Sequence, residues 1–253
     1  MSFNRAFAGV KPALTALALV IGSAAMVPVH ANPDLVAGWL AACLDETAPR
    51  SQRLTDCTQV IDAQDVDADD RADALLARGQ LHEATGDLSA AQADYAKAAE
   101  IDPENDQAHF LLGNVQETLG LFEQALSSYD AAIRINPEHD DAYNNRGRVL
   151  EELGQYEQAI DSFTASIRID PEDPAPYYNR GTVWLTLDDF SKALEDFEKA
   201  IALGLKDADL LASRGRAHEG LGNIEAARAD YKAALADDPA NDGAIDGLKR
   251  LPQ

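Results

Sequence analysis

The chain has 253 residues, with 44 acidic against 21 basic side chains and a formal net charge of −23. This excess of negative charge argues against binding to nucleic acid or to anionic lipid, because both require basic surfaces. The composition includes only two tryptophans, and no stretch alternates between apolar and polar residues over the length of a strand, so we expect an all-α protein.

Residues 1–31 have the features of a signal peptide. Arg5 and Lys11 precede an apolar run that ends at Val29, and no acidic residue falls within the run. We expect cleavage after Ala31, which would place the mature protein in the periplasm or outside the cell, without an integral membrane segment. An uncleaved anchor is the alternative, although the run is short for a spanning helix.

Residues 32–71 are expected to form a helical hairpin that caps the N-terminal end of a longer helical array. Two apolar stripes at helical spacing flank a turn at Ala48-Pro49. Cys43 and Cys57 lie on facing helices, so in an oxidising compartment we predict a Cys43–Cys57 disulfide that stabilises by about 3 kcal/mol. With no other cysteine or histidine near them in sequence, the two do not resemble a metal site.

A second interpretation of Cys43 stays open. Leu40-Ala41-Ala42-Cys43 has the residue types of a lipoprotein processing box, in which the cysteine is lipidated. The box does not directly follow the apolar run, which favours the disulfide.

The acidic stretch at residues 65–70 begins like a calcium loop. The loop pattern requires glycine and glutamate where this chain has Asp70 and Leu76. We therefore expect a linker that supplies the N-cap of the next helix.

From residue 72 the chain repeats itself every 34 residues. Prolines mark the register, and Leu205 occupies the one slot without proline: Pro103, Pro137, Pro171 and Pro239. The register divides the chain into five segments: 72–105, 106–139, 140–173, 174–207 and 208–241. A fixed period of this length indicates an array of one supersecondary unit.

Each segment carries small and large residues at the same positions. Position 8 is always glycine: Gly79, Gly113, Gly147, Gly181 and Gly215. Position 24 is always aromatic: Tyr95, Tyr129, Phe163, Phe197 and Tyr231. Small residues at positions 8 and 20 let two helices approach closely, while the ring fills the gap beside them. Glycine at position 15, replaced once by Asp188, and proline at position 32 end the two helices, so each segment is a helical hairpin that must stack on its neighbours.

Residues 242–253 are expected to form a final helix that caps the stack. Ile245 and Leu248 fall on one side, and the basic pair Lys249-Arg250 falls near its end.

These positions resemble the signature of the tetratricopeptide repeat (TPR) family, which has small residues at positions 8, 20 and 27, a bulky residue at 24 and proline at 32. The resemblance covers residues 72–241. It implies a right-handed α-solenoid of stacked antiparallel helical hairpins, with the first helix of each hairpin on the concave face.

Position 7, usually apolar in the family, is arginine in four segments: Arg78, Arg146, Arg180 and Arg214. Position 23 offers an aspartate to three of them, so we predict the ion pairs Arg78–Asp94, Arg180–Asp196 and Arg214–Asp230 within the hairpins. The alternative is a ladder of arginines that grips an anionic ligand.

By resemblance, positions 2, 5, 9, 12 and 13 point into the concave groove. Its middle then presents a candidate partner-binding strip: Phe110, Asn114, Asn144, Arg148, Tyr178 and Thr182. The rings would be apolar anchors, the asparagines would bind the backbone of an extended peptide, and the arginine would bind a carboxylate. The alternative is that these are ordinary exposed helix residues.

The sequence contains no glycine-rich phosphate loop, no nucleophile paired with a base and no cluster with metal-ligand spacing. We therefore expect no catalytic residues, no metal and no cofactor. The sequence favours a non-catalytic protein–protein interaction scaffold of the bacterial cell envelope, with a peptide or protein partner in the groove. Two alternatives stay open: an envelope assembly factor that binds a glycan or a peptidoglycan machine, and an enzyme with a site built across repeats.

Overall fold

The computed structural model describes residues 32–252, which form helices and no strand. The expected signal peptide therefore lies outside the described residues. The helices follow one another as α1 (Pro33–Leu44), α2 (Arg50–Asp62), α3 (Ala68–Glu83), α4 (Leu88–Ile101), α5 (Asp106–Thr118), α6 (Phe122–Ile135), α7 (Asp140–Glu152), α8 (Tyr156–Ile169), α9 (Ala175–Thr186), α10 (Phe190–Ala202), α11 (Ala208–Gly220), α12 (Ile224–Asp237) and α13 (Asp242–Arg250). None of these helices combines the length and apolar character needed to cross a bilayer.

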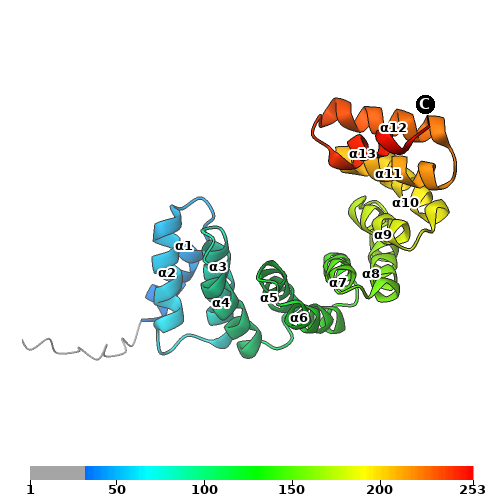
Figure 1. Cartoon of the computed structure of the whole chain (residues 1–253). Helices are drawn as coiled ribbons and strands as arrows, with labels where there is room; N and C mark the ends of the chain where they lie inside the picture. The colour runs from blue at the N-terminus through cyan, green and yellow to red at the C-terminus, as the bar shows by residue number, and fades with distance from the viewer. Residues whose placement is uncertain (1–31, 253) are drawn as a thin grey trace, which may run out of the picture.

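Consecutive helices pack as hairpins, and the hairpins stack into a curved α-solenoid (Figure 1). The first helices of successive hairpins touch one another: α5 contacts α7, α7 contacts α9, and α9 contacts α11. The second helices α6, α8 and α10 have no comparable contacts with each other. The first helices therefore lie on the inner side of the curve and the second helices on the outer side.

The glycine at position 8 and the ring at position 24 meet inside every hairpin. A Cβ atom added to Gly147 would lie less than 3 Å from three atoms of the Phe163 ring, and the other four glycines face their own rings in the same way. All five rings are at most 1% exposed. Each hairpin is thus closed by a ring packed on bare helix backbone.

Left-handed residues end the first helices at position 15 as expected. In the fourth segment a glycine, Gly204, also takes the place of the missing proline after the second helix. Gly86, Gly120, Gly154 and Gly222 have φ between 70° and 80°, and Asp188 takes the same place with φ 58°. In the fourth segment, which lacks proline, α10 ends at Ala202 and Gly204 adopts φ 100°. A left-handed glycine therefore follows the end of α10, whereas a proline follows the second helix of the other four hairpins.

The three predicted ion pairs are confirmed. Each arginine donates from Nε and Nη2 to both carboxylate oxygens of its aspartate, over 2.5–2.9 Å: Arg78–Asp94, Arg180–Asp196 and Arg214–Asp230. The aspartates are buried, and the hydrogen bonds that Arg78 donates to Asp94 raise the pKa of this arginine. Position 7 therefore ties the two helices of a hairpin together, and the alternative of a ligand-gripping ladder is wrong for these three arginines.

Two of the four arginines at position 7 also reach the preceding hairpin of the repeat array. Arg180 Nη1 donates to Thr164 of α8 at 2.8 Å. Arg146, whose own hairpin has Ser162 at position 23, donates to Asp130 of α6 at 3.0 Å. These contacts join one hairpin to the next as well as closing each one.

The N-terminal pair α1–α2 contains the predicted disulfide, Cys43–Cys57, with the two Cα atoms 4.8 Å apart. Both cysteines are buried in a cluster that includes Ala74 and Ala77 of α3. The Asp67 side chain accepts a hydrogen bond from the backbone N–H of Asp70, which confirms the N-cap expected of the acidic stretch. This cap starts α3 at Ala68, about a turn before the first 34-residue segment.

At the other end of the array, α13 packs on α11 and α12. Gly247 lies against the Tyr231 ring, and Arg250 makes a bidentate ion pair with Glu219 of α11, with both distances 2.9 Å. The last hairpin is therefore covered by apolar contact and by an ion pair.

Changing Gly147 to alanine should destabilise the array by about 1–3 kcal/mol, because the new methyl group overlaps the Phe163 ring. Gly38, in α1, is the matched control, since a Cβ there meets nothing within 4 Å. Gly38→Ala should be neutral or stabilising by up to about 1 kcal/mol. Thermal unfolding of the two variants measures the difference, and equal effects would contradict the packing argument.

Changing Asp196 to serine should cost about 1–3 kcal/mol, because it leaves the half-buried guanidinium of Arg180 without its carboxylate. The second hairpin already carries Leu112 and Ser128 at these two positions. Adding Arg180→Leu should therefore restore most of the loss. Urea unfolding of the two single variants and the double variant gives the coupling energy. A double variant no more stable than Asp196→Ser would refute the coupling.

Reduction of the disulfide should weaken the N-terminal pair by about 3 kcal/mol, because the loop between the cysteines spans only 14 residues. Hydrogen exchange should then accelerate in α1 and α2 while α7 and α8 keep their protection, since repeats contact only their neighbours. Equal acceleration along the whole array, or none in α1 and α2, would be the opposite result.

Candidate peptide-binding groove

The predicted strip lies on the inner helices α5, α7 and α9. At its N-terminal side, the Phe110 ring is half-buried, with its centroid 4.5 Å from that of His139 and 6.2 Å from that of Tyr129. The ring packs against the cluster of Ala125, Tyr129 and Val149 and stays partly exposed. Phe110 is thus a rigid apolar surface on α5.

The two asparagines of the strip are bound by asparagines of the following hairpins. Asn114 Oδ1 lies 2.8 Å from Tyr129 Oη and accepts a hydrogen bond from Asn145 Nδ2 at 2.9 Å. Asn144 Oδ1 accepts from Asn179 Nδ2 at 2.9 Å, and Asn144 is 9% exposed. Asn144 is therefore occupied in joining α7 to α9. Asn145 and Asn179 are therefore part of the same series of amide hydrogen bonds, here called the amide row. Both occupy position 6 of their segments, and this shared asparagine is the feature of the sequence that could have indicated the row.

A second set of contacts pairs position 12 of one hairpin with position 9 of the next. Arg148 Nη2 lies 2.8 Å from Glu117 Oε1. Thr182 Oγ1 donates to Glu151 Oε1 at 3.1 Å, and burial raises the pKa of that carboxyl. Arg250 of α13 stands at position 9 of a sixth half-repeat and pairs with Glu219 in the same way. Arg148 and Thr182 are thus parts of a ladder along the groove.

The tyrosines at position 24 join this ladder from the core. Tyr129 Oη donates to Glu117 Oε2 at 2.8 Å, and Tyr231 Oη donates to Glu219 Oε2 at 2.6 Å. Burial raises the pKa of both phenols, which stay protonated as donors. Each of these glutamates is therefore held by a tyrosine from its own hairpin and by an arginine from the next helix.

Tyr178 lies at the other end of the strip, in a hollow between α9, α11 and α13. The hollow has a volume of about 790 Å³, and its lining combines apolar side chains with four acids and two arginines: Tyr178, Leu185, Phe190, Asp209, Glu219, Asp242, Asp246, Arg216 and Arg250. Burial raises the pKa of Tyr178, whose ring centroid lies 6.1 Å from that of Phe197. The sequence did not reveal this hollow, because Phe190 and the residues of α13 lie outside the predicted groove positions.

The strip therefore divides into two parts. The hydrogen bonds of the amide row link Asn114 and Asn144 through Asn145, with Phe110 beside Tyr129. Tyr178 belongs to the C-terminal hollow, and Arg148 and Thr182 lie on the ladder between the two parts.

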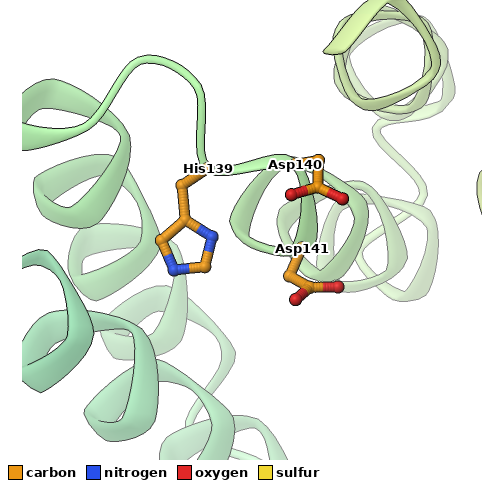
Figure 2. Close-up of side chains that lie close together, drawn as sticks. All are labelled: His139, Asp140 and Asp141. Atoms are coloured by element: carbon orange, nitrogen blue, oxygen red, sulfur yellow. The ribbon is translucent and has the colours of Figure 1, made fainter. Parts of the chain in front are cut away.

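One cluster within residues 32–252 has ligand atoms close enough to suit a metal ion: His139, Asp140 and Asp141, within 4.8 Å of one another. Figure 2 shows these side chains together at the start of α7. His139 is the N-cap, and its Nδ1 accepts from the N–H of Ala142 at 3.4 Å. The two aspartates lie in the first turn, where they favour the helix dipole. Helix capping accounts for the arrangement.

Two histidines lie beside aspartates in a way that suggests a catalytic pair at first sight. His82 Nε2 is 3.9 Å from Asp94, and His218 Nε2 is 3.9 Å from Asp230. Both aspartates already accept two hydrogen bonds from arginine. The histidines are therefore outer neighbours of structural ion pairs.

Comparison with known proteins agrees with this geometry. The profile of the tetratricopeptide repeat family matches residues 58–106, 72–137, 110–174 and 178–242. No curated protein matches the sequence significantly.

Solved structures with the same architecture include YrrB, titled a TPR protein with an unusual peptide-binding site (TM-score 0.65, 22% identity, 76% of this chain and 97% of that one). PilF of Pseudomonas aeruginosa is similar over 85% of this chain and 97% of its own, with TM-score 0.73 and 16% identity. MamA from Desulfovibrio magneticus RS-1 is similar over 68% and 98%, with TM-score 0.62 and 20% identity. The chain belongs to the tetratricopeptide repeat family.

Proposed function

We propose that this protein is a non-catalytic scaffold that binds a peptide or a protein segment along the inner surface of α5, α7, α9 and α11. The observation that carries the proposal is the pair of half-buried rings, Phe110 and Tyr178, at the two ends of a polar ladder on that surface. Rings held by packing lose little entropy on binding and make effective anchors. YrrB has a peptide-binding site by its title, but the likeness concerns the fold, so the proposal rests on these residues.

The polar groups between the rings suit a peptide backbone or a side chain. The exposed Arg148 guanidinium lies in the ladder, with its Nη2 in contact with Glu117. The side-chain N–H groups of Asn114 have no partner among residues 32–252, because its hydrogen bonds are made through Oδ1. An extended segment lying on this surface would meet donors between two apolar anchors.

An oxidising compartment, the bacterial periplasm or the cell exterior, is the second part of the proposal. The Cys43–Cys57 disulfide supports it, because such bonds persist where thiols are not kept reduced. The leader-like composition of residues 1–31 agrees with export.

Site-specific photocrosslinking tests where the partner binds. A benzophenone side chain at position 148, exposed on α7, should capture a discrete partner from envelope extract. The same group at position 161, exposed on the outer helix α8, should not. Capture at position 161 alone, or retention of glycan without protein at position 148, would refute peptide binding in the groove.

Truncation of the two rings tests the anchors. The double variant Phe110→Ala and Tyr178→Ala should weaken binding of the captured partner by at least about tenfold, because hot-spot rings are worth about 2 kcal/mol each. Leu119→Ala removes an exposed apolar side chain outside the groove and should leave binding unchanged. Circular dichroism shows whether the ring variant stays folded, and unchanged affinity in a folded variant would contradict the proposal.

A further inference from the structure

One side of α1, the first helix of the array, is apolar and uncovered. Val36 and Cys43 of this helix are buried against α2, α3 and the linker between them. On its other side Leu35 and Leu44 are 53% and 43% exposed, the largest exposed fractions of any large apolar side chain within residues 32–252. No residue from 35 to 44 carries a charge. The solvent-facing side of α1 therefore has the composition of a buried surface.

Gly38 lies in the middle of this exposed face. A Cβ atom added to any other helix glycine of residues 32–252 would meet side-chain atoms within 4 Å, in most cases those of a ring, whereas at Gly38 it meets nothing. Glycine inside a helix costs about 1 kcal/mol relative to alanine. In the hairpins the close packing of a ring offsets this cost. At Gly38 nothing in the described part of the chain offsets it, so the bare backbone is open to another molecule.

The exposed face of α1 lies at a place where hairpin stacking stops. In the array, the first helix of each hairpin is covered by the second helix of the preceding one: α4 packs on α5, α6 on α7, and α8 on α9. No helix precedes α1 within residues 32–252. The last helix, α13, closes the other end with charged exposed residues: Asp242, Asp246, Lys249 and Arg250. A polar outer face keeps the end of a repeat array soluble, and α1 lacks such a face.

Charge indicates which molecule covers α1. The chain has a net charge of −23, so most approaches of two copies bring like charges together. The α1 face has one acid, Asp34, at its start. If two α1 helices pack antiparallel, each Asp34 lies near the turn after the other helix, where two acids and two arginines balance: Asp45, Glu46, Arg50 and Arg53. A second copy can therefore approach α1 without net repulsion, whereas the charged α13 does not match an apolar face.

We propose that two copies of this chain associate through α1, packed antiparallel about a twofold axis near Gly38, with Leu35 and Leu44 of each copy covered by the other. The helix has 12 residues and is about 18 Å long. This contact is smaller than a standard interface of about 800 Å² per partner, so we expect a weak dimer with a Kd of about 50–500 μM. The chain is then monomeric at about 5 μM, where the unfolding of Gly147→Ala and Gly38→Ala is compared.

Sedimentation equilibrium of the full chain, purified from the envelope fraction of an expressing strain, measures the association. The average mass should rise from that of a monomer towards that of a dimer between about 5 μM and 1 mM. Combining Leu35→Glu with Leu44→Glu should raise the Kd at least about tenfold, because it removes apolar contact and brings like charges together. Both side chains are exposed, so the fold should be kept. Leu119→Glu changes an exposed leucine after α5 and should associate like the unchanged chain.

A crosslink locates the contact. Gly38→Cys, treated with a short bis-maleimide, should give a covalent dimer, because the twofold axis brings the two copies of position 38 together. Leu119→Cys should not give one. Cys43 and Cys57 form a disulfide and do not react with the reagent.

Several results would overturn the inference. These are a monomer at every concentration up to about 1 mM, association that the two glutamates leave unchanged, or a crosslink at position 119 and none at position 38. A monomer that floats with phosphatidylcholine vesicles, and loses this binding in the glutamate variant, would assign the face to lipid instead. None of these measurements involves a ligand in the groove, so their failure leaves the proposed function standing.

Discussion

The contact between a helix backbone and an aromatic ring is the constraint on which this array depends. In each hairpin a glycine at position 8 leaves no room for a side chain, and the ring at position 24 occupies that room and is excluded from water. The two helices are thereby set at a close and repeated distance, which allows hairpins of the same shape to stack. Packing takes up these positions in every repeat, and the inner positions 5 and 9 are left to differ from one hairpin to the next, whereas position 12 is glutamate in every hairpin except the fourth.

Much of the fold could be predicted because its decisive contacts lie within one repeat. Gly147 with Phe163 and Arg180 with Asp196 are each 16 residues apart on a fixed register, so a single sequence shows both partners in the same phase. The amide row and the 12-to-9 ladder join residues about one repeat apart, such as Asn144 with Asn179 and Glu117 with Arg148. These pairs follow from the register only when the distance between neighbouring hairpins is known, so the groove was predicted as a set of exposed residues and its internal bonds were missed.

Three glutamates of the inner surface are held by other side chains, despite the negative charge of the chain. Glu117 and Glu219 each contact an arginine and a tyrosine, and Glu151 contacts Thr182. These contacts hold neighbouring hairpins in line. Net charge therefore describes the solubility of the whole chain better than it describes what its inner surface binds.

The fourth hairpin shows how an irregular repeat can create a site. It lacks the proline of the register and ends α10 at Gly204, it turns at Asp188 instead of glycine, and it has Leu185 where the other hairpins have glutamate. The first two changes are compensated locally by backbone geometry, because another residue adopts the required left-handed conformation. The change at Leu185 has no such compensation: Arg216 makes no hydrogen bond or ion pair among residues 32–252, and an apolar side chain is added to the hollow beneath α13. The fourth and fifth hairpins therefore stack through α9, α10 and α11 without the polar contact between positions 12 and 9 that Glu151 and Thr182 make one repeat earlier.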